Sequence, residues 1–336
     1  MFTDEAEVWY GISQFNVLAQ NVSIPGLSPL FPQVHCTQDG TICQLTIGEG
    51  EINAASSIAA LVHSPKTSLE LTYFLIAGIA GVNPKVATIG SVTFARYAVQ
   101  VALQFEIDAR EIPADFPTGY FPQGTTAPGQ FPADIYGTEV FEVNEQLRQR
   151  AFAAAQKATL FDTAAAEQMR MQYAASPIFA LANANGSSVV LCDTATSDTF
   201  WSGTLLGDAF ENTTKVFTNQ AGVYCTTQQE DNATLNALLR GALSNLVDFS
   251  RIIVMRSASD FDRPPPGVSA VDLLLGPAPG FEPAILNLHL AGVKVVKMIV
   301  DGWFETFEEG IRPKNYVGDI FGSLGGHPDF VPESIF

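Results

Sequence analysis

The sequence is poor in positive charge. It has 17 lysine and arginine residues against 35 aspartate and glutamate residues, and its net charge at pH 7 is −18. A surface this acidic repels the phosphates of nucleic acids and the headgroups of anionic lipids. We therefore expect no nucleic-acid partner.

The sequence also lacks a long hydrophobic run. Its most apolar stretch, residues 69–82, is shorter than the roughly 20 residues that a spanning helix needs, and it contains Glu70. We therefore predict no membrane span, and the first residues show no signal-peptide pattern. The 336 residues, 47% of them hydrophobic, suffice for one large core. Without repeats or a visible linker, we predict a single domain over residues 1–336.

Patterns typical of metal or nucleotide cofactors are missing as well. The four histidines lie far apart and no CxxC pair occurs, so neither a metal site nor a Ser–His triad is expected. The segment Gly48–Asn53 begins like a dinucleotide loop, but it lacks the third glycine and carries Glu49 and Glu51. We interpret it as a tight strand-to-helix turn and expect no cofactor.

The chain has few cysteines, but their number is even. Cys36 and Cys43 bracket the turn TQDGTI and could close a small loop, in which case Cys192 and Cys225 would pair across the fold. Four N-glycosylation motifs begin at Asn21, Asn185, Asn212 and Asn232. Together with the low lysine content, these features predict a secreted or cell-wall-associated extracellular protein. The alternative is a cytosolic protein with four buried free thiols.

Short apolar runs alternate with helical patterns along the chain. The predicted strands cover residues 44–47, 72–76, 91–97, 99–107, 188–192 and 251–255. The predicted helices cover residues 53–62, 139–175, 233–246 and 283–310, and a loop rich in proline and aromatics covers residues 112–138. This alternation predicts an α/β fold with a largely parallel sheet.

Three acidic clusters are candidates for chemistry. They are residues 4–7, Glu230 with Asp231 at a helix start, and Asp260 with Asp262 after the predicted strand 251–255. Open α/β sheets bind ligands at the carboxyl ends of their strands, which is where Asp260 lies. A helix cap or turn for Asp260, and a helix-dipole role for Glu230, are the purely structural alternatives.

Several segments together resemble the fungal family of purine nucleoside permeases, a divergent branch of the nucleoside phosphorylase/nucleosidase superfamily. They are LTIGEGEINAASSIAAL, YFLIAGIAGVNP, GSVTFARYAVQVALQFEIDARE, TGYFPQG, YCTTQQEDNATLNALL and MRSASDFDRPPPG. The resemblance covers nearly the whole chain. It implies a three-layer α/β/α fold with a central mixed sheet.

The resemblance to the methylthioadenosine nucleosidases of this superfamily also implies roles for single residues. Glu230 would hold the ribose hydroxyls and Asp260 would protonate the purine at N7. Glu5 or Glu7 would position the attacking water, and the sequence leaves that choice open. Phe210 would stack on the base.

Other residues follow from the same segments. The Gly-rich turn Gly78–Gly81 and the Gly-Asp-Ala-Phe segment that contains Asp208 would border the substrate. Gln229 stands where these enzymes have a methionine next to the ribose glutamate. Tyr120 and Phe121 lie in a stiff aromatic loop, residues 116–131, that would close the partner's pocket in a homodimer, or would pack on its own subunit.

The reaction favoured by these residues is hydrolysis of the N-glycosidic bond of purine nucleosides such as inosine, guanosine and adenosine. Phosphorolysis would need a cationic cradle, for which Arg96 and Arg256 are the candidates. The acidic loops around residues 4–7 and 48–53 favour water over phosphate as the nucleophile. A protein that binds nucleosides for uptake, without chemistry, is the alternative from a different class.

Overall fold

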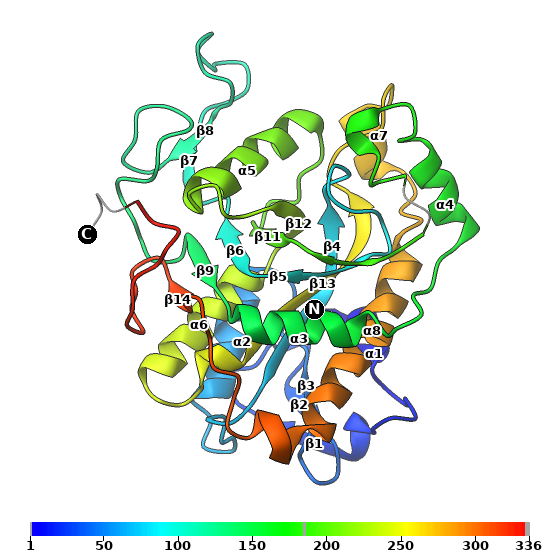
Figure 1. Ribbon diagram of the computed structural model, residues 1–336, viewed down its shortest axis with the longest axis vertical. Coiled ribbons are helices and arrows are strands. Elements are labelled where there is room, and N and C mark those ends of the chain that lie inside the picture. The colour runs from blue at the N-terminus through cyan, green and yellow to red at the C-terminus, as the bar shows by residue number, and fades with distance from the viewer. Residues whose placement is uncertain (1, 184–185, 333–336) are drawn as a thin grey trace.

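The structure is a computed structural model that describes residues 2–183 and 186–332. Within these residues, nine strands form the main sheet (Figure 1) in the order β10-β5-β13-β4-β12-β11-β6-β9-β14. In that order the strands span Val189–Leu191, Val92–Ala95, Ile252–Phe261, Phe74–Val82, Tyr224–Gln228, Asp193–Thr196, Tyr97–Gln100, Val140–Glu142 and Gly318–Asp319.

The main sheet is mixed. Strands pair in parallel in β10–β5, β13–β4, β12–β11 and β11–β6. They pair antiparallel in β5–β13, β4–β12, β6–β9 and β9–β14. The mixed sheet implied by the family resemblance is therefore confirmed, whereas the largely parallel sheet predicted from the alternation of strands and helices is wrong.

Helices cover both faces of this sheet and make three layers. The alternation of side chains along β13 shows why: Ile253 and Met255 join the hydrophobic core formed with α8 and α3. Ile252 and Val254 point the other way, into the core formed with α2 and α6. These helices span Phe281–Asp301, Glu145–Ala155, Glu51–Val62 and Asp231–Leu243. The predicted α/β/α architecture is confirmed.

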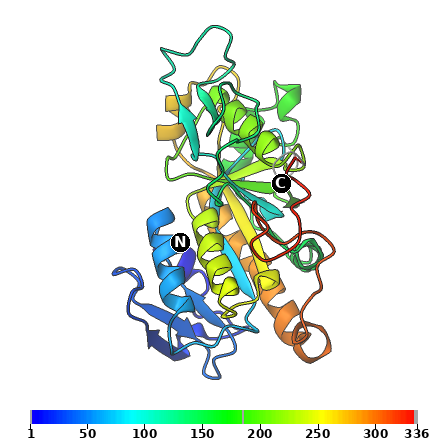
Figure 2. The ribbon, with the colours of Figure 1, turned by 90° about the vertical axis from the view of Figure 1, so that its left-hand side faces the viewer.

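The remaining elements extend this sandwich. A small antiparallel sheet of β1, β2 and β3 packs on α2 (Figure 2), and β7 pairs with β8 in a separate hairpin. These strands span Gln20–Ser23, Gln33–Cys36, Cys43–Leu45, Gln104–Glu106 and Tyr120–Pro122. The other α-helices are α1 (Thr3–Glu7), α4 (Ala164–Met171), α5 (Thr204–Phe217) and α7 (Ala270–Leu275). Single helical turns cover Val17–Ala19, Pro177–Phe179, Phe249–Arg251 and Trp303–Phe307.

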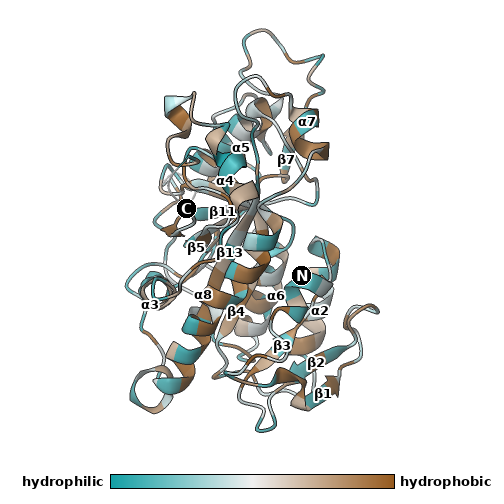
Figure 3. Cartoon of the chain, turned by 90° about the vertical axis from the view of Figure 1, so that its right-hand side faces the viewer, coloured by the Kyte–Doolittle hydropathy of each residue, from teal (hydrophilic) through white to brown (hydrophobic). Residues whose placement is uncertain are grey.

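One helix among the described residues, α8, is long and apolar enough to cross a membrane by length and composition alone. The sequence predicts this helix over residues 283–310, although residues 69–82 were taken as the most apolar stretch. In this fold α8 packs on β13, β4 and β5, with Leu288, Ala291 and Val295 buried in the shared core. Figure 3 shows hydrophilic bands that interrupt its hydrophobic surface. A core helix passes the same test of length and composition.

The predicted Gly-rich turn at Gly78–Gly81 is wrong, because these residues lie inside β4. The glycines allow neighbouring side chains to cross the strand. A Cβ on Gly78 would lie 2.5 Å from Nη1 of Arg256, and one on Gly81 would lie 2.4 Å from Oγ1 of Thr227. The glycines therefore provide close approach within a strand instead of a turn.

Two other segments of the structure differ from the prediction. The helical segment predicted over residues 139–175 begins with β9 and is interrupted between α3 and α4. Helix α5 was not predicted as an element, although its buried residues Ala209, Phe210, Thr213 and Phe217 recur at helical spacing.

Candidate active site

A cavity of about 180 Å³ lies where β4 and β13 meet the ends of β11 and β12. Its walls combine carboxylates, hydroxyls and aromatic rings. The residues that line it are Phe2, Glu5, Glu49, Ile79, Ala80, Gly81, Ser197, Thr199, Phe200, Trp201, Thr227, Gln228, Gln229, Glu230, Ser259 and Asp260. The three acidic clusters singled out in the sequence each contribute at least one of them.

Asp260 lies near the carboxyl end of β13, opposite Gly81 of β4. Oγ of Ser259 lies 2.6 Å from Oδ1 of Asp260 and 3.1 Å from the carbonyl oxygen of Ala80. The Ser259 hydroxyl has one proton, which it donates to Oδ1 of Asp260, and the Ala80 carbonyl is a second acceptor nearby. Burial raises the pKa of Asp260 and favours its neutral form, although the hydrogen bond from Ser259 opposes this effect.

Glu230 lies at the N-cap position of α6. The N–H of Gly50 donates to Oε1 of Glu230 at 3.2 Å, and Nη2 of Arg256 donates to Oε2 at 3.2 Å. Burial would raise the pKa of Glu230, but Arg256 and Gly50 outweigh this effect and hold the pKa below its ordinary value. The carboxylate is therefore ionised and fixed in orientation, in the positive field of a helix N-terminus.

Arg256 lies beneath the cavity, and its guanidinium N–H groups already donate to several acceptors. Nη2 donates to Oδ1 of Asp231 at 2.5 Å, and Nε donates to Oδ2 at 3.3 Å. Nη1 donates to the carbonyl oxygen of Ile79 at 3.1 Å. The other phosphate candidate from the sequence, Arg96, donates to Oε1 of Glu142 at 2.7 Å and does not line the cavity.

The sequence leaves open whether Glu5 or Glu7 positions the attacking water, and the structure distinguishes these two glutamates. Glu5 is 3% exposed and lines the cavity, and its Oε1 accepts the N–H of Ile79 at 2.5 Å. Burial raises the pKa of Glu5, against the positive charge of Arg256. Glu7, two residues along α1, is exposed and is not among the lining residues.

The aromatic wall of the cavity is formed by residues that the sequence analysis missed. Phe200 and Trp201 line the cavity, whereas Phe210 is buried against Trp201 and Tyr120 and does not line it. Asp208 is exposed on α5 and pairs with Lys85 and Arg263. The sequence carries another Asp-x-Phe triplet, residues 198–200, which begins two residues after β11. That position, at the end of a strand of the main sheet, was the available signal.

The aromatic loop of residues 116–131 lies away from the cavity. Tyr120 packs edge-on against Phe210 with ring centroids 4.9 Å apart, and its hydroxyl donates to Glu106 at 2.9 Å. Phe121 packs against Phe105 and Phe116. Both predicted pocket residues thus contact their own subunit, and neither lines the cavity.

The predicted glycosylation sites differ in accessibility. Asn21 and Asn212 are exposed, and Asn185 lies outside the described residues. Asn232 is 1% exposed, and its Nδ2 donates to the carbonyl oxygens of Thr138 and Ala98. The prediction of a glycan at Asn232 is wrong, since a buried amide with its hydrogens engaged cannot carry one in the folded protein.

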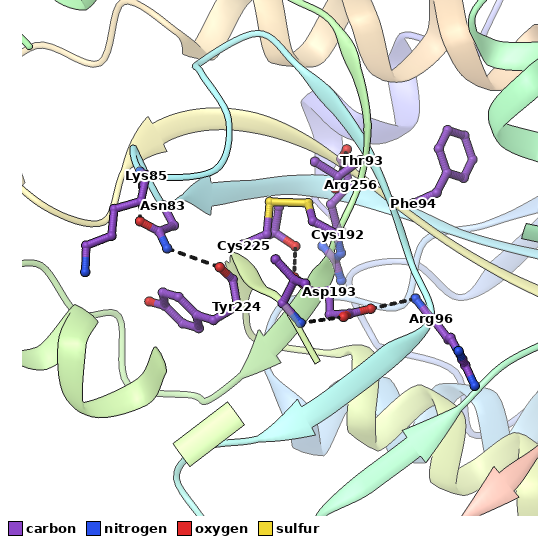
Figure 4. Close-up of a disulfide and its surroundings, with 12 residues drawn as sticks. Asn83, Lys85, Thr93, Phe94, Arg96, Cys192, Asp193, Tyr224, Cys225 and Arg256 are labelled. Atoms are coloured by element: carbon purple, nitrogen blue, oxygen red, sulfur yellow. Dashed lines mark hydrogen bonds between the residues drawn. A yellow bond between two sulfur atoms is a disulfide. The ribbon is translucent and has the colours of Figure 1, made fainter. Parts of the chain in front are cut away.

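Both predicted disulfides are confirmed. Cys36–Cys43 joins β2 and β3 of the small sheet. Cys192–Cys225 links the residue before β11 to β12 (Figure 4), the two strands that end at the cavity. Next to it, the Asp193 carboxylate accepts N–H groups from Arg96, Tyr97 and Val223. This disulfide therefore fixes the strands that carry the aromatic wall and the Gln228–Glu230 segment.

Comparison with known proteins identifies close relatives over the whole chain. A purine nucleoside permease of Candida albicans is 46% identical over 341 residues, which cover 99% of this chain and 82% of that protein. A probable purine nucleoside permease of Schizosaccharomyces pombe is 42% identical over 314 residues, which cover 90% of this chain and 88% of that protein.

The fold is shared with a solved enzyme. The 5′-methylthioadenosine/S-adenosylhomocysteine nucleosidase of Helicobacter pylori superposes with a TM-score of 0.50 at 14% identity, covering 89% of this chain and 94% of that chain. This likeness shows a nucleoside phosphorylase/nucleosidase fold. The family described as purine nucleoside permease matches residues 1–312. The chain therefore belongs to the purine nucleoside permease family.

Proposed function

We propose that this protein hydrolyses the N-glycosidic bond of purine nucleosides and releases the free base and ribose. Among the carboxyl groups that border the cavity are those of Glu5, Glu230 and Asp260. Glycosidic bonds break through a sugar cation with oxocarbenium character. Such a reaction needs an acid at the leaving group, negative charge near the sugar and a nucleophile at the anomeric carbon.

Asp260 acts as the acid in this proposal. Burial raises its pKa and favours a protonated carboxyl group at the cavity wall, although the hydrogen bond from Ser259 opposes this effect. Proton transfer to N7 of the purine converts the base into a neutral leaving group. Ser259 can hold the carboxyl group in orientation by donating its hydroxyl proton to Oδ1 of Asp260.

Glu230 supplies the negative charge next to the ribose. The bonds from Gly50 and Arg256 keep it ionised and leave lone pairs for the hydroxyls of a sugar. An ionised carboxylate near the ring also stabilises the positive charge that develops there.

The charge of the cavity wall is the observation that favours water over phosphate as the nucleophile. Among the described residues that line the cavity there is no Lys, Arg or His. A phosphate dianion would face Glu5, Glu49 and Glu230 there, and Arg256 is already bound by Asp231. Glu5, whose pKa is raised by burial, can accept a proton from an attacking water.

Two other functions lead to different products. Phosphorolysis would give ribose 1-phosphate, and the engagement of Arg96 by Glu142 and of Arg256 by Asp231 speaks against it. Binding for uptake, without chemistry, is favoured by the name of the family and of both curated relatives.

The test incubates the protein with inosine, guanosine and adenosine, with and without phosphate, and identifies the products. Free base with ribose in the absence of phosphate supports hydrolysis. Ribose 1-phosphate would assign a phosphorylase, and binding without any product would leave the uptake function.

The comparison of Glu5→Gln with Glu7→Gln provides a matched control. Both variants remove one charge from the same short helix, but only Glu5 lines the cavity. We expect a loss of turnover of about 10²–10⁴-fold for Glu5→Gln, as is typical of acid–base groups, and little change for Glu7→Gln. Equal effects would assign no role in water activation to Glu5.

We also propose that the protein is extracellular, secreted or attached to the cell wall, and that it forms a homodimer. The two disulfides support an oxidising compartment. Light scattering at micromolar concentration tests the dimer. Detection of the protein in the culture medium or the wall fraction of its native source tests the location.

A further inference from the structure

Three residues stand side by side across the middle of the main sheet, at the wall of the cavity. Gly81 of β4 pairs with Thr227 of β12 on one side and with Asp260 of β13 on the other. A side chain on the central strand would ordinarily lie between its two neighbours. Here the point where a Cβ on Gly81 would stand lies 2.4 Å from Oγ1 of Thr227 and 3.3 Å from Oδ2 of Asp260. The hydroxyl and the carboxyl group therefore both lie over the same glycine, and all three residues line the cavity.

The hydroxyl of Thr227 is not used by the fold, in contrast to those of threonines nearby. Thr196 of β11 donates to Oδ1 of Asn232 at 2.7 Å. Thr226, next to Thr227 on β12, donates to the carbonyl oxygen of Asp193 at 3.5 Å. Thr227 is half-buried, and no residue that the structure describes forms a hydrogen bond with its Oγ1. Packing alone would be served as well by valine, which has the same branched shape. The position thus offers a hydroxyl group to the occupant of the cavity.

The edge of a purine that carries N7 also carries the substituent at C6. In a 6-oxopurine this substituent is the acceptor O6, and in a 6-aminopurine it is a donor amino group. A hydroxyl group can donate to the first and accept from the second. We propose that Oγ1 of Thr227 forms a hydrogen bond with the C6 substituent when Asp260 faces N7, and that the cavity thereby takes both 6-oxo- and 6-aminopurine nucleosides.

This inference rests on the proposed function in one respect, namely that a purine nucleoside occupies the cavity with N7 towards Asp260. It adds a specificity-determining residue beside the proposed acid. Proton transfer to N7 serves every purine, whereas the contact from Thr227 exists only where C6 carries a polar substituent. A hydrogen bond between neutral groups changes affinity by roughly 3- to 10-fold, and we expect discrimination of this size against a purine with hydrogen at C6.

The experiment compares inosine, adenosine and purine riboside, which has hydrogen at C6, on the wild type and on Thr227→Val. The variant keeps the branched side chain and removes the hydroxyl. The expected result is a roughly 3- to 10-fold loss of kcat/KM for inosine and for adenosine, with little change for purine riboside. A loss of equal size on all three substrates would show a merely structural role and overturn the proposal. No loss on any substrate would overturn it as well, and so would a loss on only one of inosine and adenosine.

Two further variants sharpen this comparison. Thr227→Ser keeps the hydroxyl and removes the methyl group, so the preference for inosine and adenosine over purine riboside should persist. Thr226→Val makes the same exchange at the neighbouring residue of β12, which does not line the cavity, and should keep the preference of the wild type. If Thr227→Ser lost the preference as completely as Thr227→Val, the hydroxyl would not be the selective group.

The same three ligands separate this proposal from the proposed hydrolysis. If no product forms with any protein, the dissociation constants of the three nucleosides, measured by calorimetry, replace kcat/KM as the readout. Weaker binding of inosine and adenosine to Thr227→Val, with unchanged binding of purine riboside, would then support the contact although hydrolysis had failed. Dissociation constants that the substitution leaves unchanged would overturn it, and so would the absence of binding of all three nucleosides.

Discussion

Arg256 and Asp231 form a buried two-point ion pair, with Nη2 at 2.5 Å from Oδ1 and Nε at 3.3 Å from Oδ2. The pair joins β13, which carries Asp260, to the first residue of α6, which follows Glu230. Neither member of the pair lines the cavity. The pair therefore holds the strand that carries Asp260, the proposed acid, against the start of the helix that follows Glu230, the proposed ribose ligand.

Removal of the arginine should therefore destabilise the fold strongly. Arg256→Met leaves the carboxylates of Asp231 and Glu230 buried without their cation. Breaking a buried pair in this way costs about 3–5 kcal/mol of the free energy of unfolding, measured by urea titration. The double variant Arg256→Met/Asp231→Asn should recover part of that loss. A double variant as unstable as the sum of the two single variants would mean that the residues do not interact.

Asp260→Asn should keep the fold and lose most of the turnover. The amide has no acidic proton for N7 of the purine, and general acid catalysis contributes about 10²–10⁴-fold. Asp262→Asn is the matched control, because Asp262, the residue that follows β13, is a buried carboxyl that accepts the Tyr224 hydroxyl and does not line the cavity. Near-normal turnover of Asp260→Asn with an intact circular dichroism spectrum would remove Asp260 from the mechanism.

Gly81→Ala should disturb the cavity because there is no room for the added methyl group. A Cβ at this position would lie 2.4 Å from Oγ1 of Thr227 and 3.3 Å from Oδ2 of Asp260. We expect a lower melting temperature and a lower kcat. The addition of Thr227→Ala removes the nearer obstacle and should restore most of the stability. If Gly81→Ala melted like the wild type, the close approach of β4 and β12 would not require glycine.

The sequence made two of the acidic clusters predictable, because one follows a strongly apolar strand and the other begins a helix. Asp260 follows the predicted strand of residues 251–255, and Glu230 precedes a helix rich in alanine and leucine. The choice between Glu5 and Glu7 could not be made in this way. One of them is buried and the other exposed only because α1 packs against α8 and β4, which is a tertiary contact.

The predictions that placed residues wrongly have a common cause, because each relied on a local motif. Asp208 and Phe210 belong to a motif that matches by its letters, but it lies inside α5 and not after a strand. Gly78–Gly81 looks like a turn because glycine breaks strands more often than it fills them. In the fold, the side chains of Arg256 and Thr227 occupy the space that these glycines leave, and the local sequence of β4 gives no sign of that.

The two disulfides should differ in their effect on activity. Cys192–Cys225 links the strands that end at the cavity, whereas Cys36–Cys43 closes a short loop in the small sheet. Cys192→Ala/Cys225→Ala should lower stability by about 2–5 kcal/mol and reduce turnover. Cys36→Ala/Cys43→Ala serves as the control and should leave kcat/KM close to the wild type. Equal kcat/KM for both variants would mean that the inner disulfide does not support the site.

The buried carboxyl of Glu142 should make stability depend on pH. Burial raises its pKa to about 7, although Asn315 and Arg96 oppose this effect. The ordinary value in the unfolded chain is 4.5. Between these two values the folded state holds a proton that the unfolded state has lost, so the contribution of Glu142 to stability decreases as the pH rises from about 5 to about 7.

Glu142→Gln isolates this contribution, because the amide oxygen can still accept from Arg96 and Asn315 while the group no longer titrates. His35 and His289, whose pKa values are lowered by burial, act in the opposite direction and are present in both proteins. The variant should therefore gain stability relative to the wild type as the pH rises from about 5.5 to about 7.5, measured by urea unfolding. Glu282→Gln at an exposed position of α8 is the control and should show no such trend. A difference between Glu142→Gln and wild type that stays constant over this range would mean that Glu142 is ionised throughout it.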